Sequence, residues 1–189
     1  MSIPGINPIK TCCFSGYRPH KFGFEFKNNN PEYAKLESDL MNAILKSIDE
    51  GYTTFLCGGA MGFDLLGGET VLLLKEKHPD IKLISVIAFN GQEKTFPNEW
   101  KERYNNVLKN SDYVQKVCKK YTKGCYHMRN YEMIYSSTRV ITYFNGRTGG
   151  TANTISIAQR EGLDVLNICP DNLIKKEPIT FYTGNKYLT

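Results

Sequence analysis

The sequence predicts a single α/β domain with three layers, in which a mostly parallel β-sheet is covered by helices on both faces. Three observations lead to this prediction. Short apolar segments alternate with amphipathic helical segments about six times along the 189 residues. The apolar segments are hydrophobic almost without interruption, as strands of a buried parallel sheet are. No repeat, linker or low-complexity stretch divides residues 1–189, so we expect one core over about residues 9–170 and a polar C-terminal tail.

Each predicted strand is a short apolar run, and glycines close the first two. The first strand ends at Gly16, and the second ends at the pair Gly58 and Gly59. The third is apolar enough to be buried on both faces of a sheet. The six strands are expected at residues 9–15, 52–57, 81–89, 112–118, 139–144 and 165–169.

The first predicted helix has clear start and stop signals. Asn30 is a favourable N-cap, and Pro31 occupies the first helical position. Apolar residues then recur every four positions from Leu36 to Ile48, and Gly51 ends the run. Four further helices are expected at residues 61–78, 99–110, 126–136 and 151–161.

Charge and hydropathy limit the classes of partner. The net charge of +5, from 24 Lys and Arg against 19 Asp and Glu, favours anionic partners without requiring nucleic acid. A membrane span needs about 18 consecutive apolar residues, and runs such as residues 83–89 are far shorter. Residues 1–10 lack the apolar core of a secretory signal. We therefore expect a soluble, cytoplasmic protein without a membrane partner.

The cysteines and histidines do not indicate a metal site. The six cysteines form no C-x-x-C pair, and most lie in apolar segments, which is typical of small buried hydrophobes in a reducing compartment. The three histidines do not supply the clustered spacing of a zinc site either. We expect no metal and no cofactor.

Three glycine-containing turns follow predicted strands. They are residues 16–19, 58–64 and 146–151. In open parallel sheets, ligands bind beyond the carboxyl ends of the strands, where such turns expose backbone amides and helix N-termini. The three turns are therefore the predicted ligand site.

Two of these segments carry a resemblance to a known family. Residues 11–19, TCCFSGYRP, and residues 58–64, GGAMGFD, together resemble the YpsA-type proteins of the SLOG superfamily. The resemblance extends over about residues 11–169, with Tyr17 at a position that is usually His. It implies a Rossmann-like fold. The superfamily includes the LOG-type phosphoribohydrolases, the DNA-processing protein DprA, and sensor domains for nucleotide-derived signals such as ADP-ribose derivatives.

A second pattern resembles the LOG enzymes only in part. Their segment M-H-x-R-K-x-x-M is matched at His127, Arg129 and Met133, but Asn130 replaces the lysine. In their segment P-G-G-x-G-T-x-x-E, Thr154 stands at the position of the glutamate. A carboxylate stabilises the positive charge that develops when an N-glycosidic bond breaks, and a threonine cannot. The resemblance therefore implies that phosphate handling is present and that the catalytic carboxylate is absent.

The turn at residues 58–64 has two interpretations. Gly58, Gly59 and Gly62 either let amides at a helix N-terminus cradle a phosphate or permit a tight turn and close packing. Asp64, in the first helical turn, either caps that helix or accepts hydrogen bonds from ribose hydroxyls.

Basic and hydroxyl side chains complete the candidate site. Arg18 follows the first strand, where a guanidinium can hold a phosphate through two hydrogen bonds. Arg129 either does the same or pairs with Glu132, three residues further on. The Thr151 hydroxyl either caps a helix or binds phosphate.

Lysines at 116, 119, 120 and 123 form a basic segment. Only Tyr121 adds an aromatic ring to it, so a solvated loop is expected rather than a nucleic-acid patch.

We therefore expect a protein that binds a nucleotide or a nucleotide-derived, ADP-ribose-like ligand, and that senses or sequesters it. By analogy with its relatives, we also expect a homo-oligomer. The first alternative is an N-glycosidase or phosphoribohydrolase of nucleoside monophosphates that uses Asp64, Glu69 or Glu132 as its carboxylate. The second is DprA-like binding of single-stranded nucleic acid. The expected ligand-binding residues are Ser15, Gly16, Arg18, Gly58, Gly59, Gly62, Asp64, Arg129, Gly149, Gly150 and Thr151.

Overall fold

A six-stranded parallel sheet forms the centre of the molecule. The computed structural model describes residues 3–171, so nearly all of the predicted C-terminal tail lies outside the described residues. The strand order is β4-β3-β2-β1-β5-β6, and every pairing between neighbouring strands is parallel, where the sequence predicted a mostly parallel sheet. The strands are β1 (Thr11–Gly16), β2 (Thr54–Cys57), β3 (Lys82–Phe89), β4 (Tyr113–Cys118), β5 (Arg139–Tyr143) and β6 (Asp164–Asn167).

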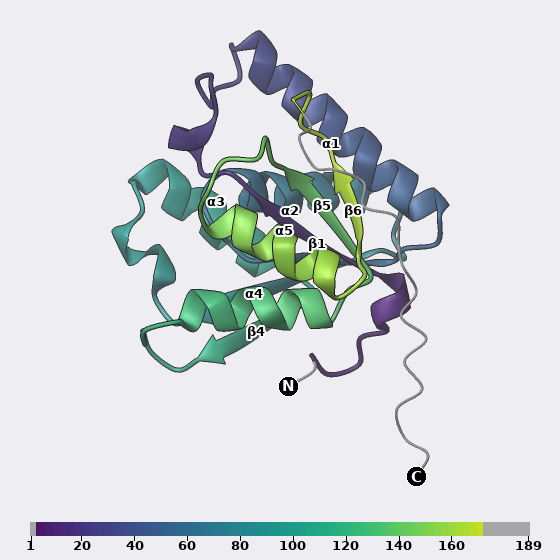
Figure 1. Cartoon of the computed structure of the whole chain (residues 1–189), viewed down its shortest axis with the longest axis vertical. Coiled ribbons are helices and arrows are strands. Elements are labelled where there is room, and N and C mark those ends of the chain that lie inside the picture. Colours follow the sequence, from purple (N-terminus) through teal and green to yellow (C-terminus); the bar gives the residue numbers. More distant parts are fainter. Residues whose placement is uncertain (1–2, 172–189) are drawn as a thin grey trace.

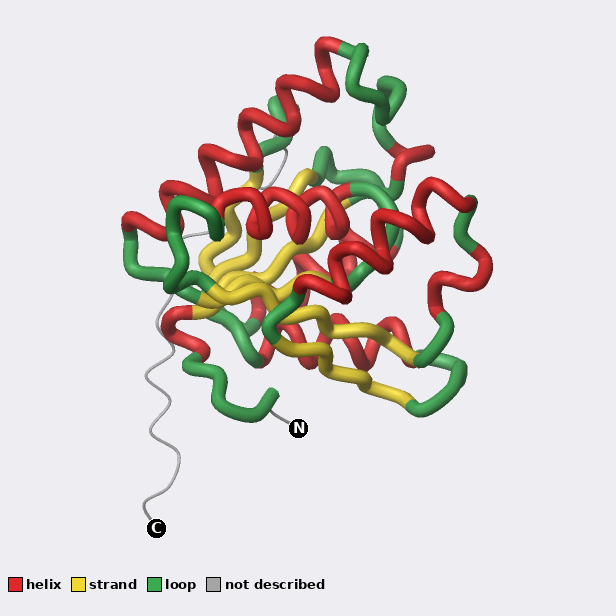
Figure 2. The backbone as a smooth tube through the Cα atoms, turned by 180° about the vertical axis from the view of Figure 1, so that it is seen from behind, coloured by secondary structure: helices red, strands yellow, loops and turns green. Residues whose placement is uncertain are grey.

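Helices cover both faces of this sheet, as predicted. Helix α2 packs between α1 and α3 and against β1, β2 and β3, whereas α4 and α5 pack together on the face turned to the viewer in Figure 1. Seen from behind in Figure 2, the strands run between the two helical layers. The helices are α1 (Pro31–Asp49), α2 (Phe63–Leu74), α3 (Asn98–Asn110), α4 (Cys125–Tyr135) and α5 (Gly150–Arg160).

Helix α1 shows how local sequence sets an element boundary. The Asn30 side chain accepts hydrogen bonds from the backbone N–H groups of Glu32 and Tyr33, which would otherwise lack partners in the first turn. The helix ends before Gly51, whose φ of +92° is strained for any residue with a Cβ. The N-cap predicted at Asn30 is confirmed.

The strand order determines where a ligand site can form. From β1 the chain adds β2, β3 and β4 on one side, and it then crosses over to add β5 and β6 on the other. Such a reversal leaves a crevice outside the carboxyl ends of the adjacent strands β1 and β5. The three predicted glycine turns follow β1, β2 and β5, which are adjacent in the sheet, so they meet at this edge.

The thiols are free, and most of them belong to the core. All six cysteines are unpaired, and five of them are buried, with half-buried Cys118 as the exception. Burial raises the pKa of Cys13 and of Cys57 to about 12, which makes both thiols poor nucleophiles. The predicted role as buried hydrophobes is confirmed for these five residues.

Residues 3–171 contain neither a membrane-spanning helix nor a metal-binding cluster. No helix in this range is long and apolar enough to cross a membrane. The same range contains no group of three or more His, Cys, Asp or Glu side chains placed to hold a metal ion.

Candidate functional site

A cavity of about 370 Å³ lies at the carboxyl end of β1, beside helices α4 and α5. This volume is within the range of small-molecule sites. The wall is built from the end of β1 and the loop after it, the start of α2, one side of α4 along most of its length, and the N-terminal part of α5. Of the residues predicted to bind a ligand, the wall contains Ser15, Gly16, Arg18, Asp64, Arg129, Gly150 and Thr151.

The loop after β1 brings basic side chains to the cavity. Arg18 is followed by a 3₁₀ turn, Pro19–Lys21, and Arg18, His20 and Lys21 all line the wall. Within the described residues, no carboxylate lies at ion-pair distance from Arg18 or Lys21. Two cations without an ion-pair partner in the described part of the chain make this part of the cavity attractive to anions.

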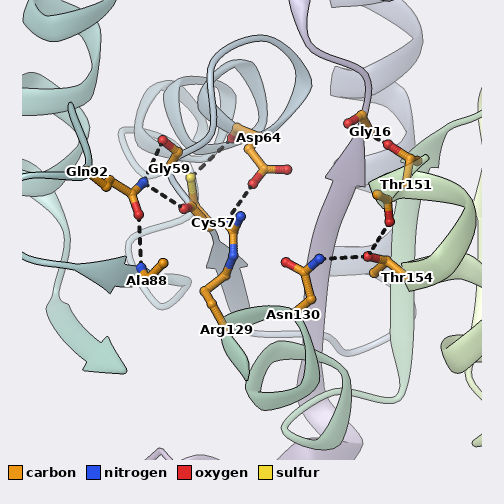
Figure 3. Close-up of polar contacts among 12 residues, drawn as sticks. Gly16, Cys57, Gly59, Asp64, Ala88, Gln92, Arg129, Asn130, Thr151 and Thr154 are labelled. Atoms are coloured by element: carbon orange, nitrogen blue, oxygen red, sulfur yellow. Dashed lines mark hydrogen bonds and ion pairs between the residues drawn. The ribbon is translucent and has the colours of Figure 1, made fainter. Parts of the chain in front are cut away.

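A buried ion pair forms another part of the wall. Arg129 Nη1 donates to Asp64 Oδ2 at 3.2 Å, and the two residues are only 5% and 7% exposed (Figure 3). Burial raises the pKa of Asp64 above its ordinary value, although Arg129, the Ala60 N–H and Arg18 oppose the rise. The alternative pairing of Arg129 with Glu132 is wrong. Arg129 Nε is buried and has no hydrogen-bond partner among residues 3–171, so this guanidinium has donor capacity that the described part of the chain does not use.

Neutral side chains join α4 to α5 across the cavity wall. Asn130 Nδ2 donates to Thr154 Oγ1 at 2.9 Å, and Thr154 Oγ1 donates to the Gly150 carbonyl at 3.0 Å. Figure 3 shows these contacts beside the ion pair. Asn130 and Thr154 both line the cavity.

The N-terminus of α5 lies at the same wall. Thr151 Oγ1 donates to the Gly16 carbonyl at 3.0 Å, so it ties α5 to the end of β1 and does not cap its own helix. No side chain caps α5 at Gly149, which has a φ of +138° and lies outside the wall. The amides of the first turn of α5 are therefore without a side-chain partner at the cavity.

The glycines after β2 have packing roles. Gly58, Gly59 and Gly62 lie outside the cavity wall. A Cβ on Gly58 would lie 1.6 Å from Arg129 Nη1, and one on Gly62 would lie 2.4 Å from the Tyr17 carbonyl oxygen. Gly59 and Gly62 also have positive φ angles, of +66° and +94°. Close packing accounts for all three, and their contact with a ligand stays a prediction.

Only one of the three candidate carboxylates faces the cavity. Asp64 lines it, whereas Glu69 lies outside the wall and accepts from Arg103 Nε at 2.8 Å and Nη2 at 2.6 Å. Glu132 also lies outside the wall, and its Oε1 is buried without a hydrogen-bond partner.

The sequence-based set of ligand-binding residues missed five polar side chains of the wall: His20, Lys21, Tyr126, Asn130 and Thr154. Asn130 and Thr154 had a visible signal, since they are the two departures from the LOG pattern. Tyr126 and His20 flank matched motifs but had no pattern of their own.

The comparisons with known proteins agree with this architecture. The model of the YpsA family, described as the YspA SLOG family, matches residues 12–162. The chain belongs to this family. The resemblance drawn from residues 11–19 and 58–64 is thereby confirmed.

Relatives of this YpsA-family chain occur in Halalkalibacterium halodurans and Bacillus subtilis. A UPF0398 protein of Halalkalibacterium halodurans is 27% identical over 172 residues, which cover 87% of this chain and 90% of that protein. The UPF0398 protein YpsA of Bacillus subtilis is 30% identical over 105 residues, which cover 56% of this chain and 58% of that protein.

A solved structure shares the fold of this YpsA-family chain. DNA processing protein A (DprA) from Streptococcus pneumoniae superposes with a TM-score of 0.54 at 18% identity. The match covers 83% of this chain and 49% of the DprA chain, so the chain spans about half the length of DprA. This likeness confirms the Rossmann-like fold.

Tyr17, the departure from the usual histidine, has a structural role in this YpsA-family chain. Its ring is 1% exposed, its hydroxyl donates to Asn145 Oδ1 at 2.5 Å, and it accepts from the Asn145 N–H at 3.2 Å. The phenol therefore links the loop after β1 to the loop after β5, which are two of the three segments that meet at the site.

The two departures from the LOG pattern contact each other. Asn130 stands at the lysine position and Thr154 at the glutamate position, and their side chains share the 2.9 Å hydrogen bond. A neutral hydrogen-bonded pair therefore occupies the place where the LOG resemblance implies opposite charges.

Proposed function

We propose that this chain binds a nucleotide or nucleotide-derived anion, such as an ADP-ribose derivative, in the cavity and senses or sequesters it. One observation carries the proposal: Arg18 and Lys21 have no carboxylate partner at a cavity that also contains the incompletely paired Arg129.

The chemistry of phosphate binding fits this arrangement. A guanidinium can donate two parallel hydrogen bonds to a phosphate, and a lysine adds a point charge. The uncapped N-terminus of α5 contributes backbone N–H groups and the positive end of the helix dipole. Tyr126 also lines the cavity and offers an aromatic ring near these groups.

A thermal-shift panel of AMP, NAD, ADP-ribose and cyclic ADP-ribose isomers tests the proposal. A ligand at 100 times its Kd should stabilise the fold by about 2.7 kcal/mol. The double variant Arg18→Ala/Lys21→Ala should lose most of this stabilisation. The matched control, Lys119→Ala/Lys120→Ala, removes the same charge at exposed positions outside the cavity and should keep it. A panel without any response contradicts the proposal.

Asp64 supports a second candidate function, the N-glycosidase or phosphoribohydrolase alternative, because it is the one candidate carboxylate in the cavity wall. Its pKa, raised by burial, lets this carboxyl group hold a proton at a higher pH than an exposed aspartate does, which suits a general acid. Incubation with nucleoside monophosphates would then release free base, Asp64→Asn would abolish the release, and Glu69→Gln would leave it intact. Intact AMP after prolonged incubation rules out this activity towards AMP.

Single-strand binding, the third possibility, would use a different surface. Lys116, Lys119, Lys120 and Lys123 are exposed and lie outside the cavity. Salt-sensitive retention of labelled single strands, lost in Lys119→Ala/Lys120→Ala, would favour this function over the first.

A further inference from the structure

The uncharged part of the cavity wall presents hydrogen-bond acceptors, because its hydroxyl groups already donate their hydrogens to carbonyl groups of the protein. A hydroxyl has one hydrogen to donate. The Thr154 hydroxyl gives its hydrogen to the Gly150 carbonyl, and the Thr151 hydroxyl gives its hydrogen to the Gly16 carbonyl. Both hydroxyl oxygens can therefore only accept from anything else.

This arrangement also fixes the orientation of the Asn130 amide. Because Thr154 Oγ1 has already used its hydrogen, the group that faces it at 2.9 Å has to be a donor, which is Asn130 Nδ2. The Asn130 Oδ1 atom is consequently turned away from Thr154. It has no hydrogen bond within the described residues, and Asn130 lines the cavity.

Asp64 adds a further acceptor. Its Oδ2 accepts from Arg129, and Figure 3 shows the other carboxylate oxygen turned away from Arg129, to the side where Thr151 lies. The Ala60 N–H also acts on this carboxylate, but each carboxylate oxygen has two lone pairs, and Asp64 lines the cavity, so the group can accept further hydrogen bonds there.

We propose that these acceptors, Asp64 and Asn130 above all, select ligands that carry sugar hydroxyls close to their anionic group. Arg18, Lys21 and Arg129 attract the anion, but inorganic phosphate would bring no sugar hydroxyls to the acceptor groups beside them. A ribose phosphate brings an anionic group and a hydroxyl pair within one small unit. The inference rests on the proposed function and narrows its ligand class to phosphates with a free ribose diol.

The physical basis is the asymmetry of hydrogen bonding in buried sites. A site built to bind a hydroxyl strongly rejects the analogue that lacks it, because its buried polar groups are then left unpaired. A site that contacts only the phosphate binds the hydroxylated ligand and its deoxy analogue with equal affinity.

The test compares AMP with 2′,3′-dideoxy-AMP by isothermal titration calorimetry on the full chain. The unaltered protein should bind the dideoxy analogue at least tenfold more weakly. Asp64→Asn retains the side-chain shape and one acceptor. It should reduce the ratio of the Kd for dideoxy-AMP to the Kd for AMP severalfold. Asn130→Ala, on a different helix, should narrow it independently, and the exposed-site control Lys119→Ala should leave it unchanged.

Each outcome decides the inference. The inference is supported if the Kd for dideoxy-AMP is at least ten times the Kd for AMP and this ratio falls in a folded Asp64→Asn or Asn130→Ala variant. Equal affinity for AMP and the dideoxy analogue overturns it and leaves the proposed function standing. Failure to bind AMP overturns it as well; if ADP-ribose still binds, the proposed function survives, and if no ligand of the panel binds, both fall.

Discussion

Two buried arginines stand at opposite edges of the sheet and differ in how completely they are paired. Arg139 begins β5, at the amino edge, and all three of its guanidinium nitrogens have partners: Nε and Nη2 contact Asp164 at 2.7 and 2.6 Å, and Nη1 contacts Ser47 and Glu50. Its guanidinium also lies 4.5 Å from the centre of the Tyr52 ring.

Within residues 3–171, Arg129 at the carboxyl edge forms one ion pair, through Nη1 to Asp64; its guanidinium lies 6.0 Å from the centre of the Tyr126 ring, and its buried Nε has no hydrogen-bond partner. Buried donors normally find hydrogen-bond partners within the fold. Stability therefore explains the complete pairing of Arg139 but not the incomplete pairing of Arg129. The comparison assigns Arg139 to the scaffold and Arg129 to the site.

The largest expected effect is on stability. Arg139→Met should lower the free energy of unfolding by about 2–4 kcal/mol, because it removes a buried cation from its hydrogen-bond network. It should leave the affinity for AMP unchanged at temperatures where the fold persists. Arg129→Met should lower the affinity for AMP at least tenfold, and it should also cost stability because it leaves the buried Asp64 without its partner. Urea denaturation and calorimetry on both variants measure these quantities, and equal affinity losses would erase the distinction between the two arginines.

The space that Gly58 leaves for Arg129 provides a second test, of intermediate size. Gly58→Ala places a methyl group where Arg129 Nη1 now lies, so the guanidinium has to move. We expect a loss of about 1–3 kcal/mol in the free energy of unfolding, together with weaker AMP binding.

Gly23→Ala is the matched control for this change, since a Cβ at Gly23 meets nothing within 4 Å. If Gly58→Ala and Gly23→Ala have the same free energy of unfolding and the same affinity for AMP, the position of Arg129 does not depend on the space beside Gly58.

The smallest expected effect is a pH dependence of stability. The pKa of Asp64 is raised in the folded state, chiefly by burial, so folding favours its neutral form. The stability that this form contributes is complete below about pH 4 and is lost as the pH rises through the raised pKa. The free energy of unfolding, relative to that of Asp64→Asn, should therefore fall between pH 4 and pH 7.

Asp112 provides a control of opposite sign. Burial alone would raise its pKa, but hydrogen bonds from Lys75 and the Leu83 N–H outweigh burial and hold the pKa below its ordinary value. Relative to Asp112→Asn, stability should be retained above pH 4 and lost as the pH falls through the lowered pKa. Identical slopes for the two variants in urea denaturation would contradict the burial argument for Asp64.

Much of the fold was predictable from the sequence, because local signals determine it. Asn30 and Gly51 mark the ends of α1, and continuous apolar runs mark the strands. The observed start of a strand differs from the predicted one where another local structure forms in its place. Residues Pro8–Lys10 form a 3₁₀ turn, so β1 begins at Thr11 rather than at residue 9.

The site was predictable only in part, because its decisive contacts join residues far apart in the sequence. Asp64 and Arg129 are separated by 65 positions, and no periodicity indicates their pairing. The packing role of Gly58 depends on the same long-range contact. Motifs identified Arg18 and Thr151. They did not indicate the directions of the hydrogen bonds, which leave the wall with acceptor groups.

A crystal structure of the chain with ADP-ribose is the most direct test of the central claim. The account predicts phosphate oxygens within hydrogen-bond distance of Arg18 or Arg129, at the N-terminus of α5. A phosphate bound instead at the exposed lysines of residues 116–123, or an unaltered cavity under saturating ADP-ribose with Arg129 still bound to Asp64 alone, would contradict it.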